Sequence, residues 1–494
     1  MGKPIWPKSS PARVDRSLSA HSVMGLVLSA ILYVVCVSGT LAVFEDEFGW
    51  WERPASPMVT EVTPEAAQTA AEQVMMAQPE TTHLYLYMPR DNWPRFVAGG
   101  DDGIETMDAS GEPVGAYESA WNSFLIELHY YLSLPHSFGM IIVAITGVML
   151  LAMTVSGLLA HPRIFRDAFR LKRSGQPRLV QADLHNRLSV WTAPFHIAVA
   201  ATGAMIGLFV VVALVLAQTS YDGDTRALSN SIFGEEGEPD MTPADLPDVS
   251  AALSTFLEQD TGHEPFMIIV HDPMTAGQHV EVFAHHENRL IYGETYEFSP
   301  DGTFLGHGGY SDGELGRQMA YSVYRLHFGD FGGMAMKFAY FVLGVILCII
   351  IASGLNIYFL KRAEQGKPQP RLAASWSACV WGVPGLMILA LGLALPGASM
   401  AVMTVLFWLG LVGLCVAGLL AKSPVQIGLW IRRGTGAVMI CTGLGHSALH
   451  PETLGNLYIA GCNAALILGG SALLFWSFIH KTVAPPLTQA QAAE

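Results

Sequence analysis

Eight apolar stretches recur along the chain, and each is close to the ~20 residues that an α-helix needs to cross a bilayer. The first is too long for a signal peptide and lacks a small-residue cleavage site, which predicts a retained anchor. The pattern predicts a mainly α-helical, polytopic membrane bundle of about eight spans. The stretches cover roughly residues 22–44, 138–160, 188–217, 334–360, 376–396, 400–421, 434–449 (short and rich in glycine) and 456–479.

Two long polar segments, residues 45–128 and 218–326, interrupt the apolar pattern. Each begins with Thr-Pro, at Thr63-Pro64 and Thr242-Pro243, a typical helix start. Each continues with strand-like alternation and ends in a turn that leads to a short apolar segment. The same order occurs twice, which predicts two copies of one small α+β module. The strands are expected at His83–Met88, Pro94–Ala98, Ile104–Asp108, Phe266–His271, His279–Ala284 and Leu290–Phe298.

These patterns divide the chain into a repeated unit of span, module and span, followed by a helical extension without an assigned role. The expected organisation is an N-terminal segment with the first span (1–44), module one (45–128), spans two and three with a basic loop (129–217), module two (218–326), span four (327–362) and a four-span extension with a tail (363–494).

Charge is scarce and unevenly distributed. Only 14% of the residues are charged, against about 25% in soluble domains, and the net charge is −15. Segments 1–21, 161–187, 361–375, 422–433 and 480–494 together carry +14, whereas the rest of the chain carries −29. The positive-inside rule therefore predicts a multi-pass membrane protein with both termini in the cytoplasm and both modules outside. We expect membrane lipid to surround the spans. The acidic outer surface excludes nucleic acid as a partner.

Two kinds of motif are missing from the sequence. It has no C-x-x-C-H, which excludes a covalently attached c-type haem. It also has no G-x-G-x-x-G after a strand and no flavin-binding segment, so any reducing equivalents come from a separate donor.

Histidines collect at the ends of the first four spans. Ionisable groups at membrane depth are costly and indicate function. Imidazoles on facing helices are what a bis-histidine b-type haem requires. The residues concerned are His21, His129, His136, His161, His185, His196 and His327.

Depth along the helices sorts these histidines into two levels. His129 and His327 each lie about 30 Å to the outer side of their span centres, which predicts an outer haem between them. On the inner side His21 pairs with either His185 or His196, which are 11 residues apart and share a helix face. His161 lies near the same level, so a third haem or a different inner pair is also compatible with the sequence.

Three further features have alternative interpretations. His446 and His450 are four residues apart in the extension. They are candidates for a pair of metal ligands, for structural residues or for part of a quinone site. His285-His286 is a candidate weak metal site. A set of aromatic side chains forms either a docking face, or part of a module core together with an aromatic girdle at the membrane surface. That set is Trp50, Trp51, Tyr85, Tyr87 and Trp93.

The ordered set of motifs over residues 14–362 resembles the PepSY-associated transmembrane helix family, and the two modules look like PepSY domains. The motifs are Ala20-His21-Ser22-Val23-Met24-Gly25-Leu26, Leu128-His129 with Leu132, Ser156-Gly157-Leu158-Leu159-Ala160-His161-Pro162-Arg163, Asp183-Leu184-His185-Asn186-Arg187, Pro194-Phe195-His196 with Thr202-Gly203-Ala204, and Leu326-His327-Phe328-Gly329-Asp330-Phe331-Gly332-Gly333.

The resemblance implies a function in iron uptake. Members of this family include dihaem reductases of ferric siderophores in the bacterial inner membrane. Carried over motif by motif, the resemblance implies two haem b groups held by His21, His129, His185 and His327, with His161 and His196 as additional histidines. The expected enzyme takes electrons from a quinol or a separate reductase and reduces a periplasmic ferric chelate or siderophore.

Three other functions compete with this expectation. A PepSY protein without haem would be a membrane regulator or assembly factor. The repeated spans also suit a transporter, although spans one to four carry almost no acidic residue at mid-membrane depth. The histidines also suit a metal-handling accessory protein without haem.

Overall fold

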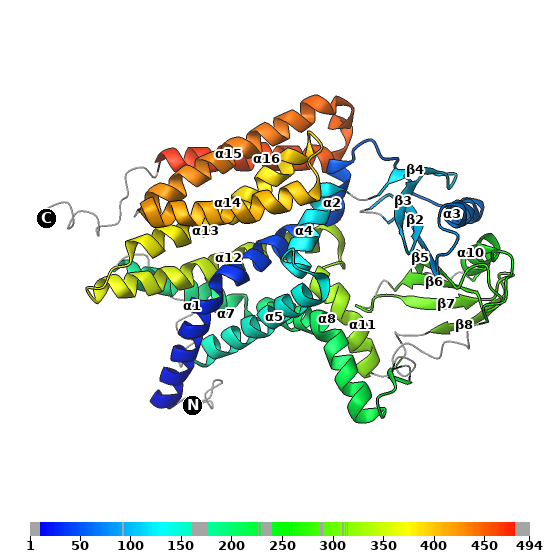
Figure 1. The fold of residues 1–494 in the computed structure, drawn as a ribbon, viewed down its shortest axis with the longest axis horizontal. Coiled ribbons are helices and arrows are strands. Elements are labelled where there is room, and N and C mark those ends of the chain that lie inside the picture. The colour runs from blue at the N-terminus through cyan, green and yellow to red at the C-terminus, as the bar shows by residue number, and fades with distance from the viewer. Residues whose placement is uncertain are drawn as a thin grey trace. The chain divides into compact units, whose positions relative to one another are not determined.

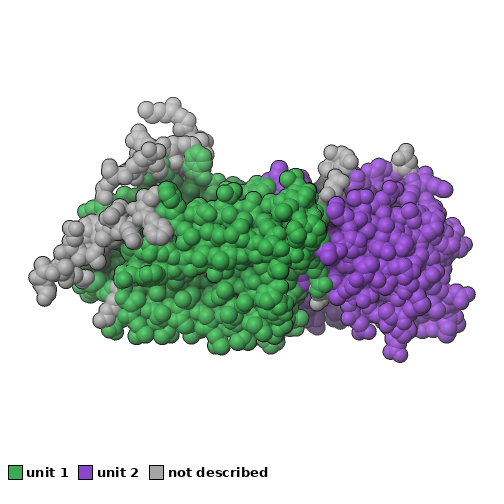
Figure 2. Space-filling model, turned by 90° about the horizontal axis from the view of Figure 1, so that it is seen from above, with its two compact units in different colours: residues 1–54, 120–207, 337–494 green, residues 55–119, 208–336 purple. Residues whose placement is uncertain are grey.

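The computed structural model describes residues 10–90, 93–117, 119–160, 176–225, 227–228, 240–259, 261–286, 290–308, 311, 313, 315–421 and 423–479. The chain forms two compact units, coloured separately in Figure 2. Unit 1 comprises Met1–Pro54, Ala120–Gly207 and Lys337–Glu494, and unit 2 comprises Ala55–Ser119 and Leu208–Met336. Two of the four boundaries fall within helices, namely α8 (Ala193–Ser220) and α12 (Gly333–Glu364).

Within the described ranges, seven helices are long and apolar enough to cross a membrane. They confirm a polytopic helical protein and match seven of the eight predicted spans. They are α1 (Pro11–Ala42), α5 (His136–Leu159), α8, α12, α13 (Pro370–Ala394), α14 (Met400–Ala421) and α16 (Leu457–Ile479), drawn in Figure 1.

The eighth predicted stretch, 434–449, lies in α15 (Pro424–Leu449), which is a helix of 26 residues. Helix α15 is not among the candidate spans, because polar residues such as Arg432, Arg433 and His446 lower its mean hydropathy. It packs against α13 and α16 as a member of the C-terminal bundle. The structure therefore confirms a helix over the eighth stretch, and this helix begins ten residues earlier than the stretch does.

Short helices connect the spans of unit 1. They are α2 (Glu45–Glu52), α4 (Ala120–Tyr131), α7 (Pro177–Trp191) and the 3₁₀ helix η1 (Pro451–Gly455). Helix α7 ends at Thr192, where the backbone leaves the α-helical region, and α8 begins at the next residue. The third span therefore starts at residue 193 rather than 188, and His185 lies on a separate helix before it.

The C-terminal helices pack closely where both partners have glycine. A Cβ added to Gly436 on α15 would lie 2.8 Å from the carbonyl oxygen of Gly470 on α16. One added to Gly470 would lie 2.6 Å from the carbonyl oxygen of Gly436. Small residues at such crossings let membrane helices approach backbone to backbone.

Aromatic hydrogen-bond donors attach this bundle to the N-terminal half of unit 1. Tyr33 Oη on α1 donates to Val380 O (2.9 Å), and Trp121 Nε1 on α4 donates to Met387 O (3.0 Å). Trp51 Nε1 on α2 donates to Asn463 Oδ1 (2.7 Å). A buried N–H or O–H without an acceptor is costly, so each donor favours the packing that brings it to its acceptor. The extension is thus an integral part of unit 1.

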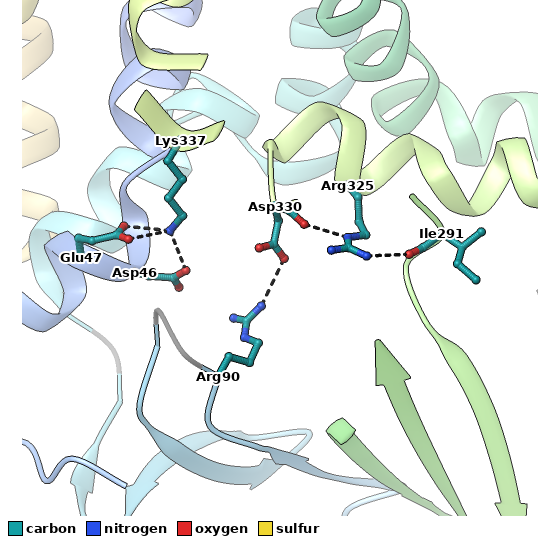
Figure 3. A network of polar contacts seen from close by, with 7 residues as sticks. All are labelled: Asp46, Glu47, Arg90, Ile291, Arg325, Asp330 and Lys337. Atoms are coloured by element: carbon teal, nitrogen blue, oxygen red, sulfur yellow. Dashed lines mark hydrogen bonds and ion pairs between the residues drawn. The ribbon is translucent and has the colours of Figure 1, made fainter. Parts of the chain in front are cut away.

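A buried ion cluster lies within the same unit (Figure 3). Lys337 Nζ lies 2.9 Å from Glu47 Oε1 and 3.2 Å from Asp46 Oδ2. The side chains of Lys337 and Glu47 are only 6% and 4% exposed. Burial raises the pKa of Glu47, and the nearby lysine opposes that shift. The cluster therefore joins α2 to the start of α12 through charges that depend on each other.

Unit 2 contains one antiparallel sheet of eight strands in the order β4-β3-β2-β1-β5-β6-β7-β8. Each predicted module supplies four consecutive strands, so the turn at the end of each module leads to a real fourth strand. The strands are β1 (His83–Tyr87), β2 (Phe96–Gly100), β3 (Gly103–Met107), β4 (Pro113–Ala116), β5 (Glu264–His271), β6 (His279–His285), β7 (Glu294–Phe298) and β8 (Phe304–Gly308).

The two modules share this sheet because β1 pairs with β5. Helices α3 (Pro64–Ala77) and α10 (Val249–Glu258) pack together beside the same sheet (Figure 1). Gln68 Oε1 on α3 accepts from Val249 N at the start of α10 (2.8 Å). Strands β1 and β5 are the equivalent first strands of the two modules, and they pair antiparallel. This pairing relates the two modules by a local two-fold axis, which the sequence repeat alone did not specify.

Two predictions about the second module are corrected by the structure. The helix expected from Thr242-Pro243 begins only at Val249, because Asp248 supplies its N-cap and Pro247 disfavours helix before it. Pro243 instead bridges to Thr275. The region expected to end module two contains a helix, α11 (Leu315–Phe328), that the pattern did not reveal.

Replacing Lys337 by methionine should destabilise unit 1 by about 3 kcal/mol, because Glu47 would remain buried without its cation. Thermal unfolding of the detergent-solubilised protein measures this loss. Arg178→Met is the control, because Arg178 and its partner Glu364 are 32% and 41% exposed. We expect that control to change stability by less than about 1 kcal/mol, and equal losses in both variants would contradict the prediction.

Candidate functional site

His21 on α1 and His185 on α7 face each other within unit 1. Their ring centroids are 6.3 Å apart and their planes are inclined by 80°. The two residues occupy equivalent places in the repeat, since each lies at or just before the first span of its half. The depth argument left His185 and His196 as alternatives, and the structure brings His185 to His21.

The imidazole of His21 is held by helix α5. Nδ1 lies 3.0 Å from Met153 O and 3.4 Å from Ser156 Oγ. A Cβ added to Gly157 would lie 3.3 Å from His21 Cε1, tighter than an ordinary contact. The ring therefore rests against a helix surface on which no side chain projects at residue 157.

Helix α12 holds His185 in the same way. Nδ1 lies 3.0 Å from both Ile350 O and Ser353 Oγ. A Cβ on Gly354 would lie 3.3 Å from His185 Cε1. The carbonyl, the serine and the glycine occupy positions i, i+3 and i+4, as they do in α5.

His129 on α4 has a third such environment, on α1. Nδ1 lies 3.0 Å from Val35 O and 3.3 Å from Ser38 Oγ. A Cβ on Gly39 would lie only 2.5 Å from His129 Cε1, so the glycine is required for this packing. We call each of these carbonyl–Ser–Gly sets a serine–glycine cradle. The segment Val199–Gly203 on α8 has the same spacing, with Thr202 in place of serine.

The spacing of the cradle has a physical reason. A helical Cβ points towards the N-terminus and covers the preceding turn, so a glycine at i+4 uncovers the carbonyl of residue i. The serine hydroxyl donates to that carbonyl, at 3.0 Å in the Met153–Ser156 set and 2.9 Å in the Ile350–Ser353 set. Its oxygen can then accept a second bond from a neighbouring ring.

The cradle determines which ring nitrogen carries the proton. A carbonyl oxygen only accepts, so Nδ1 of His21, His129 and His185 must be the donor. Nε2 then carries the lone pair. Among the described residues, none forms a hydrogen bond with Nε2 of His21 or of His185. The two facing rings thus each have a nitrogen suited to metal coordination.

Burial keeps the imidazoles on α4 and α7 neutral. Removal from water lowers the pKa of His129 to about 4 and that of His185 to about 4, and His21 adds to the effect on His185. A neutral imidazole is the form that binds a metal ion. At neutral pH both residues are therefore in the state that ligation requires.

The other predicted histidines have different positions. His196 is 2% exposed, and its Nε2 lies 3.0 Å from Thr192 Oγ1 one turn earlier in the chain. Its ring lies against that of Phe195, with the two ring centroids 5.9 Å apart. His327 lies on α11 in unit 2, so its pairing with His129 stays a prediction. His161 lies outside the described residues.

His446 is a structural residue. Its Nε2 lies 2.8 Å from Trp51 O and its Nδ1 3.2 Å from Asn463 Nδ2, and its ring stacks on Trp51 at 4.3 Å. With both of its nitrogens bonded, His446 fits the structural interpretation. Trp50 and Trp51 are buried, so the docking face suggested for them is wrong.

The two rings of the dipeptide His285-His286 contact different residues in the described part of unit 2. His285 stacks on Phe266 (4.1 Å), and the ring of His286 lies against that of His263 (4.8 Å). No cluster of three or more metal-binding side chains occurs in the described part of the chain.

Comparison with known proteins places the chain in a family. The profile of the PepSY-associated TM region matches residues 18–362. The chain belongs to the PepSY-associated transmembrane family. An uncharacterized protein of Pseudomonas aeruginosa is 26% identical over 399 residues, covering 73% of this chain and 95% of that protein. The serine–glycine cradles of this PepSY-associated protein all lie inside the matched region, whereas α13–α16 lie beyond it.

The cradle on α1 has a direct test. Gly39→Ala should displace His129 and lower the melting temperature of the detergent-solubilised protein by several degrees, because the new Cβ overlaps the imidazole. Gly413→Ala on α14 is the matched control, since a Cβ there meets nothing within 4 Å. The control should leave stability unchanged or slightly raise it. An unaltered melting temperature for Gly39→Ala would disprove the packing described above.

Proposed function

We propose that this PepSY-associated protein transfers electrons across the membrane through b-type haem and reduces a ferric acceptor outside. The observation that supports this most is the pairing of His21 and His185 at 6.3 Å, each held through Nδ1 on a separate helix. A structural pair of histidines has no need for two matched cradles.

The spacing of the rings fits axial ligation. A metal–imidazole bond is about 2 Å long and a ring centre lies roughly 1 Å behind its coordinating nitrogen, so two imidazoles sharing one metal have centres about 6 Å apart. Their observed separation of 6.3 Å agrees with that value. Each ring can rotate about its own metal–nitrogen bond, so an inclination of 80° is compatible with ligation.

The protein's own groups prepare these ligands. The Nδ1–H bonds to Met153 O and Ile350 O fix the orientation of the rings and make Nε2 more basic. The glycines of the cradles leave room for the rings against the helices. A bound haem would supply an iron that exchanges one electron at a time between the ferric and ferrous states.

The sequence assigns a second haem to His129 and His327. The cradle of His129 supports its share of this assignment, because its Nδ1 and its neutral form match those of His185. Two haems at different depths would let electrons pass from the inner level to the outer level. His161 and His196 are not needed for this dihaem scheme.

The proposed acceptor is a ferric siderophore or another ferric chelate. Family resemblance supports iron uptake, and reduction would release iron because hard oxygen ligands hold Fe(II) less well than Fe(III). The predicted outer side of the chain carries a charge of −29, which favours a neutral or cationic chelate. The proposal includes the inner membrane as location, with both termini in the cytoplasm.

A visible spectrum with haem quantitation tests the proposal. The wild-type protein should show Soret and α-band absorbance and about two haems per chain. His21→Ala and His185→Ala should each lower this to about one, because each removes one axial ligand of the same haem. His136→Ala is the control, since that side chain is 69% exposed and bonds Glu127.

The outcomes separate the competing functions. Absence of haem from the wild-type protein would overturn the proposal and favour a regulator or assembly factor. Haem loss in His196→Ala together with full haem in His185→Ala would move the inner site to the alternative pair. Bound copper or iron without haem would indicate the metal-handling function.

A further inference from the structure

A cavity of about 360 Å³ opens in unit 1 among helices α1, α12, α13 and α14. This volume lies in the range of small-molecule sites, about 300–1,000 Å³. Its walls are mostly apolar. The lining residues are Leu26, Ala30, Leu355, Tyr358, Phe359, Gln369, Leu372, Ser375, Trp376, Cys379 and Cys415.

The cavity is lined by two of the helices that carry or hold the paired histidines. Trp376 in its wall donates from Nε1 to Ala352 O (3.3 Å), and Ala352 lies between the two residues that hold His185. Leu355 directly follows Gly354 of the same cradle. On α1, Leu26 lies about 7 Å along the helix axis from His21. The cavity and the imidazole pair thus share α1 and α12.

One polar group in the lining has no protein partner. Gln369 Oε1 is buried and accepts no hydrogen bond from the residues that the structure describes. An unpaired buried acceptor is costly, so a donor from a bound molecule would stabilise it. Gln369 adjoins the exposed connection of residues 365–368, which separates α12 from α13. The cavity therefore combines apolar walls with one unpaired hydrogen-bond acceptor, Gln369 Oε1, close to the exposed connection.

We propose that this cavity binds the head group of a membrane quinol, which is the electron donor to the haem ligated by His21 and His185. The proposal rests on the haem function above. Membrane helices form the walls, so the occupant must be soluble in lipid. It must also carry a hydroxyl that donates to Gln369 Oε1. A hydroquinone has both properties, whereas a nicotinamide nucleotide would bring charged phosphates into apolar walls.

The reaction balances with the two haems of the proposed function. Oxidation of one quinol to the quinone breaks two O–H bonds and releases two electrons and two protons. The two electrons correspond to two ferric-to-ferrous reductions, one for each haem. The two protons pass to water at the exposed connection between α12 and α13, since the amide of Gln369 orients the hydroxyl but does not take up its proton.

The main test fills the cavity and measures binding directly. Ala30→Trp places an indole in the lining, whereas Val27→Trp puts the same side chain on α1 at a site that is 71% exposed and outside the lining. The purified full chain is labelled with a photoreactive azidoquinone in detergent. We expect labelled peptides from 26–30 and 355–379, competition by decylubiquinol, and roughly tenfold weaker labelling in Ala30→Trp only.

A second variant tests the acceptor. Gln369→Leu keeps the volume of the side chain but removes Oε1, so quinol should bind several-fold more weakly with the fold intact. Stopped-flow reduction of the haems by decylubiquinol should slow in Gln369→Leu and Ala30→Trp, while reduction by dithionite should not. Haem content should match that of the wild type in both variants.

The outcomes keep this proposal separate from the haem function. Normal haem content with equal labelling and equal quinol reduction in Ala30→Trp and Val27→Trp would overturn the quinol site alone. Labelling spread over all lipid-facing helices would show that the cavity holds only lipid chains, and would also overturn it. Specific labelling in a protein without haem would support the quinone-binding cavity but contradict the haem function.

Discussion

The hydrogen bond from histidine Nδ1 to a helix carbonyl is the interaction on which the arrangement of the site depends. In a membrane helix every carbonyl is already used within the helix, and its neighbours' side chains normally cover it. A glycine at i+4 uncovers one carbonyl, and a serine at i+3 adds a second acceptor beside it. The imidazole is thereby fixed in orientation and tautomer. The same solution occurs on α1, α5 and α12, so it is a general device of this fold rather than a local accident.

The internal repeat explains why two such histidines meet. Each half of the matched region contributes an imidazole near its first span and a cradle on its second. When the halves associate about a local two-fold relation, the equivalent residues His21 and His185 face each other. Unit 2 contains the same relation in another form, because β1 and β5 are equivalent strands that pair antiparallel. A duplicated sequence thus yields a pair of facing histidines in unit 1 and a continuous sheet in unit 2.

The C-terminal helices lie beyond the region shared with the family, yet they belong to unit 1. Tyr33, Trp51 and Trp121 donate buried hydrogen bonds to them, and the Trp51–Asn463–His446 network is fully bonded. These contacts use polar groups that would be costly if left unpaired. Helices α13 and α14 also complete the cavity that shares α1 and α12 with the sites of His21 and His185. Their association with α1 and α12 therefore gives the extension a place beside the proposed path of electrons.

The sequence alone determined the elements and the charge pattern. Apolar length and the 3.6-residue period located seven spans, alternation located the strands, and the repeat of histidines at span ends indicated ligands at two levels. It did not decide between His185 and His196, because both share a helix face, and only the break at Thr192 separates them onto different helices. It did not reveal that Gly39, Gly157 and Gly354 each face an imidazole, because a Ser-Gly pair gains this meaning only from a ring on another helix. Contacts between distant segments, such as β1 with β5 and Trp51 with His446, produce no periodic pattern in the sequence of either segment. Only the tertiary structure decides them, since burial and hydrogen-bond satisfaction are properties of the assembled fold.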